Sequence, residues 1–244
     1  MVLGIDIGSI YTKGVLFEKT LIKKAVVRTA FKPKQAIREI KNLLEGYDKV
    51  IATGYGRDLV DDAYKIVTEV SAFARGSTYF NPGIRTVIDI GGQDSKVIRI
   101  RDGRVEKFIM NDRCAAGTGN FIEKIAQSLN LSLSEFGALA LKSDRPETID
   151  SLCVVMAETE ILSLVQEGKR LEDIVFGVCD SLIRRINGIA GQVGIEEPIL
   201  FCGGGALNPG LVKAMRKYFR EIVIPEDPQF VGAIGAAMMI NLSK

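Results

Sequence analysis

The chain has 244 residues, of which 47% are hydrophobic and 7% aromatic, and its formal net charge at neutral pH is +2. This length and composition exclude a disordered chain and predict a globular α/β protein with one large domain or two lobes. The small net charge gives no reason to expect a nucleic acid or a membrane surface as a partner.

The chain contains no histidine, and its four cysteines are Cys114, Cys153, Cys179 and Cys202. Ser–His and Cys–His catalytic pairs and histidine-ligated metal sites are therefore excluded. Neither a signal peptide nor an apolar run long enough to span a bilayer is visible, so we expect a cytoplasmic protein. In that compartment the cysteines are not expected to form structural disulfides.

Apolar periodicity and turn residues predict elements along the whole chain. The strands expected first are 2–7, 13–18, 23–28 and 49–52, and the helices between and after them are 33–45 and 68–79. The turn-rich segment 80–85 is expected to separate two lobes. The later strands are expected at 86–90, 95–101, 104–109, 199–202 and 221–224. The later helices are expected at 117–129, 132–142, 155–167, 171–191, 208–218 and 228–242.

An internal duplication organises these elements. Residues 4–15 read GIDIGSIYTKGV and residues 87–98 read VIDIGGQDSKVI, so Asp6 aligns with Asp89. Each segment has an apolar strand, an Asp, a glycine turn and a second strand, which predicts a β-hairpin in each lobe. A tight hairpin does not require an Asp before the turn twice, so the repetition favours a functional turn.

Both turns carry residue types that suit phosphate and magnesium. Gly8 and Gly91 allow backbone N–H groups to approach an anion closely. Asp6 and Asp89 are candidates for holding Mg²⁺ or orienting water, and Gln93 is the third catalytic candidate. The further candidates for phosphate binding are Ser9, Tyr11, Thr12, Lys13, Gly92 and again Gln93.

A third glycine-rich element, Gly203, Gly204 and Gly205, lies between the strand 199–202 and a helix. This placement favours close approach of a nucleotide. Gln229 is a further candidate near the nucleotide. The sequence GxxxxGK[ST] is absent, so the chain is not a P-loop enzyme.

Taken together, the three segments resemble the phosphate-1, phosphate-2 and adenosine segments of the actin/hexokinase/Hsp70 ATPase fold. The resemblance implies a two-lobed, ribonuclease H-like α/β fold with ATP and Mg²⁺ between the lobes. Residues 1–84 would form the first lobe and residues 85–225 the second. The final helix, within 226–244, would return to the first lobe.

The segments NDRCAAGTGNF, around Cys114, and CVVMAETEILSL, from Cys153, resemble a narrower family. They are similar to the activators of 2-hydroxyacyl-CoA dehydratases and the ATP-binding subunits of benzoyl-CoA reductases, as are residues 52–57 (ATGYGR) and 87–94. The resemblance implies a homodimer with one bridging [4Fe–4S] cluster, to which each subunit contributes Cys114 and Cys153. Helix N-termini after both cysteines would point at the cluster.

Spacing alone leaves another interpretation of these two cysteines, as small buried core residues. For Cys179, in a helical run, and Cys202, at a strand end, we expect that structural role. Ala72 and Phe73 stand where the family commonly carries Cys-His, and we assign them no cluster role.

The resemblance further implies an ATPase that accepts an electron from a ferredoxin or flavodoxin. It would then deliver the electron to a partner iron–sulfur dehydratase or reductase, whose substrate the sequence does not name. Two alternatives stay open. One is a small-molecule kinase of the same fold, such as a sugar kinase, without a cluster. The other is a regulatory nucleotide-binding protein that changes partners without electron transfer.

Overall fold

The computed structural model describes residues 1–151 and 153–240. The chain divides into two compact units. The first unit contains Met1–Val87, Ile98–Phe108 and the described part of Pro225–Lys244, and the second contains Ile88–Val97 and Ile109–Ile224.

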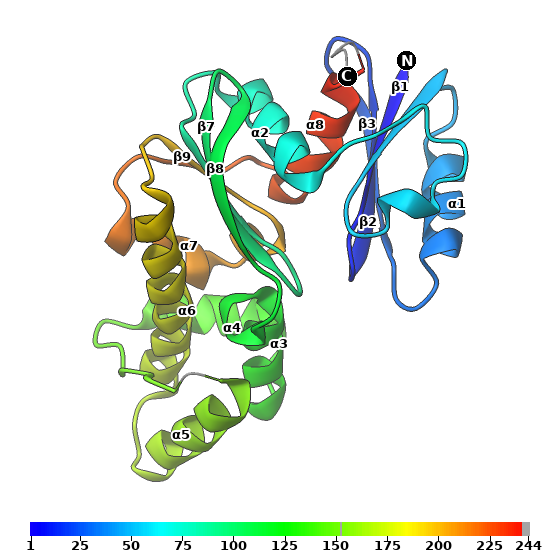
Figure 1. Cartoon of the computed structure of the whole chain (residues 1–244). Helices are drawn as coiled ribbons and strands as arrows, with labels where there is room; N and C mark the ends of the chain where they lie inside the picture. Colours follow the sequence, from blue (N-terminus) through cyan, green and yellow to red (C-terminus); the bar gives the residue numbers. More distant parts are fainter. Residues whose placement is uncertain (152, 241–244) are drawn as a thin grey trace. The chain divides into compact units, whose positions relative to one another are not determined.

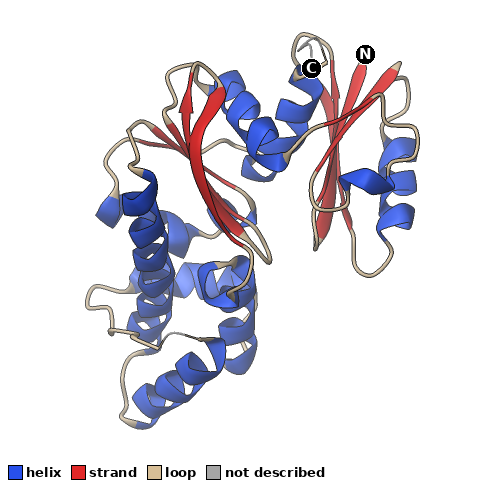
Figure 2. Ribbon diagram, in the orientation of Figure 1, coloured by secondary structure: helices blue, strands red, loops and turns tan. Residues whose placement is uncertain are grey.

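Two five-stranded sheets form the frame, and their strands follow the same order (Figures 1 and 2). The first sheet runs β3-β2-β1-β4-β5 and the second runs β8-β7-β6-β9-β10, so each strand has a counterpart five positions later in the chain. The predicted duplication is therefore confirmed at the level of topology. The first-sheet strands are β1 (Val2–Ile7), β2 (Tyr11–Phe17), β3 (Leu21–Arg28), β4 (Lys49–Thr53) and β5 (Lys65–Ile66). The second-sheet strands are β6 (Thr86–Ile90), β7 (Ser95–Arg101), β8 (Arg104–Asn111), β9 (Ile199–Cys202) and β10 (Ile222–Val223).

The expected helices are also present, with shifted ends. They are α1 (Pro33–Leu43), α2 (Glu69–Phe80), α3 (Gly119–Ser128), α4 (Leu133–Lys142), α5 (Val154–Gln166), α6 (Leu171–Val193), α7 (Pro209–Tyr218) and α8 (Val231–Met238). The start expected at 117 moves to Gly119, because a 3₁₀ turn, Ala115–Gly117, comes first. The helix expected over 228–242 divides into a 3₁₀ turn, Pro228–Phe230, and α8, and its residues 241 and 242 lie outside the described residues. The two-residue strand β5 has no counterpart among the predicted elements.

Alternation along β1 decides which way Asp6 faces. Leu3, Ile5 and Ile7 are buried in one cluster with residues of α1. The even positions point to the other face, where a Cβ on Gly4 would meet the Ala233 carbonyl oxygen of α8 at 2.1 Å. Because successive side chains of a strand point to opposite faces, Asp6 shares the α8 face with Gly4. A Cβ on Gly232 of α8 would lie 3.2 Å from the Asp6 carboxylate.

Glycines also allow α2 and α8 to cross at close range in the first unit. A Cβ on Gly235 would lie 1.7 Å from the Ala72 carbonyl oxygen, and one on Gly76 would lie 2.2 Å from the Val231 carbonyl oxygen. Any larger residue at either position would force the two backbones apart. This crossing holds α8 against the face of β1 that carries Asp6. It therefore positions the segment around Gly232 beside the Asp6 carboxylate.

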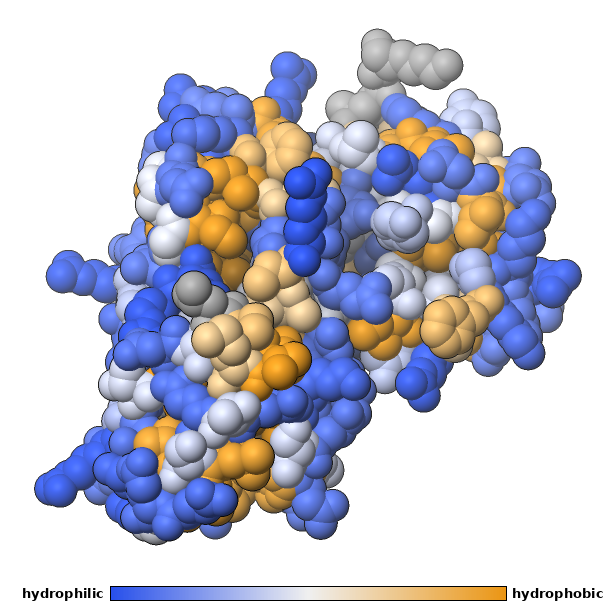
Figure 3. Space-filling model, turned by 60° about the horizontal axis from the view of Figure 1, so that its bottom comes forward, coloured by the Kyte–Doolittle hydropathy of each residue, from blue (hydrophilic) through white to orange (hydrophobic). Residues whose placement is uncertain are grey.

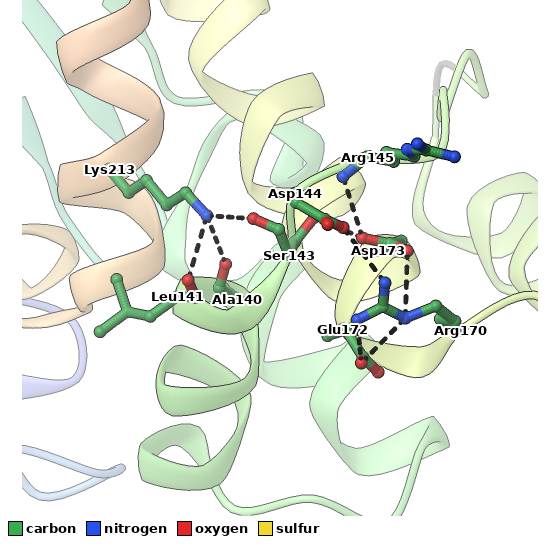
Figure 4. Close-up of polar contacts among 9 residues, drawn as sticks. All are labelled: Ala140, Leu141, Ser143, Asp144, Arg145, Arg170, Glu172, Asp173 and Lys213. Carbon is green, nitrogen blue, oxygen red and sulfur yellow. Dashed lines mark hydrogen bonds and ion pairs between the residues drawn. The ribbon is translucent and has the colours of Figure 1, made fainter.

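In the second unit, helices α3 to α7 share one large hydrophobic core with the central strands. A polar network joins three of these helices (Figure 4). Lys213 of α7 donates to the carbonyl oxygens of Ala140, Leu141 and Ser143 at distances of 3.1, 3.2 and 2.6 Å, which satisfies the carboxyl end of α4. Asp173 of α6 accepts from the Ser143 hydroxyl at 2.7 Å. None of the described helices is both long enough and apolar enough to cross a bilayer.

Candidate functional site

Asp6 is the last residue but one of β1 and is nearly buried, with 4% of its surface exposed. The Lys13 ammonium nitrogen, on the paired strand β2, lies 3.2 Å from its carboxylate. Between them the chain turns tightly, since the Gly8 N–H donates to the Tyr11 carbonyl oxygen at 3.1 Å. The turn therefore brings the Asp6 carboxylate and the Lys13 ammonium group together beside the backbone of residues 8–11.

Asp89 is likewise the last residue but one of β6, with 3% of its surface exposed. The Lys96 ammonium nitrogen lies 3.3 Å from its carboxylate and 2.6 Å from that of Asp94. The Gly91 N–H donates to the Asp94 carbonyl oxygen at 2.9 Å, as Gly8 does to Tyr11. The sequence repeat thus corresponds to a repeated local structure.

A glycine with positive φ covers each Asp from the neighbouring strand. Gly54 follows β4 with a φ of +95°, and a Cβ there would lie 2.6 Å from the Asp6 carboxylate. Gly203 follows β9 with a φ of +82°, and a Cβ there would lie 2.3 Å from the Asp89 carboxylate. Both contacts require glycine for backbone conformation and for space. The sequence analysis selected Gly203 but placed Gly54 only within a family motif.

The remaining nucleotide candidates differ in accessibility. Ser9, Tyr11, Gln93 and Gly204 are exposed. Gly8, Gly91, Gly92, Lys13 and Gln229 are half-buried, and Gly205 is buried. Thr12 is fully buried, and its hydroxyl oxygen lies 2.9 Å from that of Thr29 on the adjacent chain segment. Thr12 therefore supports the turn from inside.

Two further hydroxyl groups beside these turns escaped the sequence analysis as separate candidates. Thr53 pairs with Asp6 across the parallel strands, and Ser95 opens the strand after the Asp89 turn. Both side chains are buried, and their hydroxyl oxygens have no hydrogen-bond partner within the described part of the chain. A buried hydroxyl without a partner is uncommon in a folded protein.

Cys114 and Cys153 are exposed, whereas Cys179 and Cys202 are buried. The buried-core interpretation of the first two is therefore wrong, whereas the burial of the other two agrees with the structural role expected for them. Burial raises the pKa of the Cys179 thiol far above its ordinary value, which keeps that thiol neutral.

Cys114 is fixed through its backbone by Asn111, the last residue of β8. The Asn111 amide oxygen accepts from the Cys114 N–H at 3.1 Å, and its amide nitrogen donates to the Cys114 carbonyl oxygen at 2.8 Å. A Cβ on Gly117 would lie 2.7 Å from that same amide nitrogen. Glycine at 117 therefore leaves room for the Asn111 side chain, which hydrogen-bonds to the backbone of Cys114.

The amino end of α3 contacts the Asp89 turn directly. Gly119 and Asn120, the first two residues of the helix, donate their N–H groups to the carbonyl oxygens of Gly91 and Gly92, each at 2.8 Å. Thr118, which precedes the helix, makes no side-chain cap. The first N–H groups of a helix have no partner inside the helix, and here the glycine turn supplies two acceptors.

This contact corrects one expectation. The N–H groups at the start of α3 bind the turn, so they do not point at a group held by Cys114. Cys153 meets the expectation better, because α5 begins directly after it and its sulfur accepts from the Met156 N–H at 3.5 Å.

The chain before Cys153 is held by charged side chains. Glu160 of α5 accepts from the N–H groups of Asp150 and Ser151 at 3.1 and 3.0 Å. Burial acts to raise the pKa of Glu160, but these hydrogen bonds outweigh it and the pKa lies below its ordinary value. Arg184 of α6 donates to the Ile149 carbonyl oxygen at 2.6 Å. The loop 149–151 is thus bound from both sides.

Arg185, also on α6, contacts both cysteine segments. One terminal nitrogen donates to the Ala116 carbonyl oxygen at 3.3 Å, and the other donates to that of Ser151. Burial lowers the pKa of Arg185, and attraction to the Cys114 thiolate opposes that shift. Neither Arg185 nor Asn111 was predicted, because their partners are set by the tertiary fold. Lys96 was visible in the sequence as the counterpart of Lys13.

Four thiolates hold a [4Fe–4S] cluster, and one chain offers two exposed thiols, on segments joined by Arg185. No group of three or more His, Cys, Asp or Glu side chains converges within residues 1–151 and 153–240. The donor set therefore fits half of such a site, and a second copy of the chain would have to supply the other half.

Comparison with known proteins places these features in a family. The model of the BadF/BadG/BcrA/BcrD ATPase family matches residues 3–239. The 2-hydroxyisocaproyl-CoA dehydratase activator of Clostridioides difficile is 37% identical, over 97% of this chain and 93% of its own. A benzoyl-CoA reductase subunit from Thauera aromatica is 34% identical, over 96% of this chain and 91% of its own.

The fold agrees with this match. A solved structure of the Clostridium difficile activator with bound ADPNP superposes with a TM-score of 0.89, over 97% of this chain and 92% of that one, at 37% identity. The two-lobed actin-like ATPase fold expected from the sequence is thereby confirmed. The chain belongs to the BadF/BadG/BcrA/BcrD ATPase family.

Proposed function

We propose that this protein is an ATP-dependent electron-transfer activator. As a homodimer it would hold one [4Fe–4S] cluster through Cys114 and Cys153 of each subunit. It would pass electrons from a ferredoxin or flavodoxin to a partner iron–sulfur enzyme, such as a 2-hydroxyacyl-CoA dehydratase or a benzoyl-CoA-type reductase. When bound, the cluster supplies a one-electron carrier at low potential.

One observation carries the proposal: the Asp89 turn is hydrogen-bonded to the amino end of α3, a few residues after Cys114. Peptide groups in such a glycine turn present N–H groups to a phosphate on one side and carbonyl oxygens to their neighbours on the other. A change of phosphate at the N–H groups of Gly92 and Gln93 would therefore alter the same two peptide groups whose carbonyl oxygens, on Gly91 and Gly92, anchor α3. An ATPase that only hydrolysed nucleotide would have no need of exposed thiols at the end of this contact.

The nucleotide-binding roles follow from accessibility and charge. Asp6 and Asp89 are carboxylates of the kind that hold Mg²⁺ directly or through water. Gln93, exposed on the second turn, is the candidate for orienting the attacking water. Lys13 and the N–H groups of Ser9 and Gly92 would bind phosphate oxygens, with Tyr11 beside them. Gly8 and Gly91, whose N–H groups close the two turns, would let the phosphates approach the backbone closely. Gly203, Gly204, Gly205 and Gln229 would contact the rest of the nucleotide.

A second subunit is supported by the surface around Cys153. Val155 and Met156, the residues that follow it on α5, have 70% and 59% of their surface exposed. About two and almost three turns further along the helix, Leu162 and Val165 are exposed at 54% and 44%. Figure 3 brings this end of the second unit forward and shows hydrophobic side chains among polar ones on its surface. Packing of this helix against its copy would cover apolar surface beside the thiols.

The test is the amount of iron and acid-labile sulfide in protein purified without oxygen. We expect about four of each per dimer, and loss of both in Cys114→Ser and Cys153→Ser. Cys179→Ala, which changes a buried thiol, is the matched control and should keep the full amount. A chain that binds ATP but takes up no iron under anoxic reconstitution would contradict the proposal. A screen of phosphoryl acceptors would then test the kinase alternative.

The coupling requires its own measurement. Reduced protein should transfer electrons to a low-potential iron–sulfur acceptor when ATP is hydrolysed, and a non-hydrolysable analogue should support at most a single transfer. Transfer that proceeds equally without nucleotide would remove the ATP-driven part of the proposal and leave the cluster part standing.

A further inference from the structure

Arg185 lies where the two cysteine segments meet. Its guanidinium donates to the carbonyl oxygens of Ala116 and Ser151. The first of these residues comes two positions after Cys114 and the second two positions before Cys153. One side chain on α6 therefore bridges two segments that are remote from each other in the sequence.

The chemistry of arginine suits this bridge. The guanidinium is a planar fork of N–H donors, so one group can serve two acceptors in fixed directions. Its face is also supported, because the guanidinium carbon lies 5.4 Å from the centre of the Phe121 ring on α3. A lysine would offer the charge without the fork.

The bridge completes a chain of contacts that begins at each thiol. On the Cys114 side, Asn111 clasps the backbone of the cysteine itself. On the Cys153 side, Glu160 and Arg184 hold the loop 149–151. These contacts order each segment separately, whereas the Arg185 hydrogen bonds relate one segment to the other.

We infer that Arg185 is a positioning residue, which sets the separation of the Cys114 and Cys153 thiols so that they form one half of a four-thiolate site. This inference rests on the proposed function for its biological meaning, but the positioning itself does not. The guanidinium also places a positive charge at the two segments that carry the cysteines. A positive charge favours the more negative, reduced form of a bound cluster and so raises its reduction potential.

The first test needs no cluster. Metal-free protein is spin-labelled at Cys114 and Cys153, since Cys179 and Cys202 are buried, and diluted with unlabelled chain so that only distances within one chain are seen. Dipolar broadening of the continuous-wave electron paramagnetic resonance spectrum, which reports short separations between labels, should give a narrow distance distribution in the unaltered protein. In Arg185→Gln the distribution should be at least twice as wide. Arg216→Gln, which removes an exposed arginine in the last turn of α7, is the matched control and should stay narrow. An unchanged width in Arg185→Gln overturns the inference.

The second test uses the reconstituted dimer. Arg185→Gln should retain less than half of the iron, and its remaining cluster should have a lower midpoint potential by redox titration monitored by electron paramagnetic resonance. Arg185→Lys should widen the distances as Arg185→Gln does but restore the potential towards that of the unaltered protein. Arg185→Lys thus separates the effect of the two-donor geometry of the guanidinium from the effect of its charge. It also provides a second variant if Arg185→Gln does not fold. Equal iron content and potential in all variants would overturn the inference.

The two tests distinguish the inference from the function beneath it. If the unaltered chain takes up no iron, the proposed function fails, while the resonance distances still decide whether Arg185 joins the segments. If the unaltered chain takes up iron but the width of the distance distribution is the same in Arg185→Gln, the proposed function is kept and the positioning role of Arg185 is rejected.

Discussion

The turns that follow Asp6 and Asp89 have the same internal structure, but different parts of the chain donate hydrogen bonds to them. Each has the same tight hydrogen bond, the same Lys opposite the Asp and a positive-φ glycine above it. In the first unit the Gly8 carbonyl oxygen accepts from the Thr29 hydroxyl at 2.8 Å, at the end of the neighbouring hairpin strand. In the second unit the equivalent Gly91 carbonyl oxygen accepts from the N–H of Gly119, at the start of a helix. The first turn is tied to its own sheet, and the second is tied to the element that follows Cys114.

The two sheets also differ in the connection that follows their third strand. In the first sheet a single helix, α1, connects β3 to β4. In the second sheet four helices, α3 to α6, connect the corresponding strands β8 and β9. Both exposed cysteines lie in that longer connection. The duplicated frame repeats the Asp turn, and the longer connection in the second copy carries the exposed cysteines that the first copy lacks.

The largest effect is expected from removing one carboxylate charge at a time. Asp6→Asn and Asp89→Asn should each reduce the rate of ATP hydrolysis on the order of 100-fold or more, because each removes a group that would hold Mg²⁺ or orient water. Steady-state phosphate release checks both. Asp58→Asn, at an exposed position on the surface, is the control. A large loss in only one of the two variants would show that the turns are not functionally equivalent.

The covering glycines should give the next largest effect, on stability. Gly203→Ala and Gly54→Ala should each lower the free energy of unfolding by about 2–4 kcal/mol, through backbone strain and contact with the buried Asp. Gly168→Ala isolates the strain alone, because Gly168 has a φ of +77° but no atom lies within 4 Å of the place that the added methyl group would take. Denaturant unfolding should therefore show a clearly smaller loss for Gly168→Ala. Equal losses in all three would mean that the close approach to the carboxylates contributes nothing.

The tie between turn and helix can be loosened in each unit separately. A Cβ on Gly119 would lie 3.0 Å from the Gly91 carbonyl oxygen, so Gly119→Ala should push the helix from the turn. Nucleotide should protect the amides at the start of α3 from hydrogen exchange several-fold in the unaltered protein and less in this variant. Thr29→Val, which removes the corresponding tie in the first unit, should leave that protection unchanged. Gly188→Ala, at a helical glycine with open space, controls for the added methyl group.

The smallest effect should come from Asp173, which lies in the network of Figure 4. The hydrogen bond from Ser143, with that from the Arg145 N–H, lowers the pKa of Asp173 below 3.8. A carboxylate whose pKa is lower in the folded state adds stability above its unfolded pKa and loses it as the pH falls through the folded value. Asp173→Asn should thus lower the melting temperature by about 2–4 °C at neutral pH. The gap from the unaltered protein should close below about pH 3.8. A gap that stayed constant down to pH 2 would mean that the charge is not involved.

The strands and helices of the two sheets could be predicted from the sequence, because each depends on residues that are neighbours in the chain. The Asp-Gly turns, the alternation of β1 and the Pro33 start of α1 each depend on neighbours in the chain. Either hairpin alone could have been a simple turn, but the presence of the same Asp turn twice favoured a function that both share. The Gly203 position was also visible, since a glycine run between a strand and a helix is itself a signal.

What the sequence could not supply are contacts between distant segments. Arg185 reads as one of two adjacent arginines in a helix, and nothing local distinguishes it from Arg184. Its partners, Ala116 and Ser151, are backbone groups without a sequence signature. The exposure of Cys114 was likewise undetermined by spacing, and only the resemblance of its surroundings favoured the surface.

The equal strand order of the two sheets has an evolutionary consequence. Because one short helix is enough to lead from β3 to β4, the fold itself requires no more than that between β8 and β9. The longer stretch is an addition to the shared topology that the sheets themselves do not require. Its helices can therefore differ in number and length between related chains without any change in strand order, so changes confined to this stretch should leave both sheets intact.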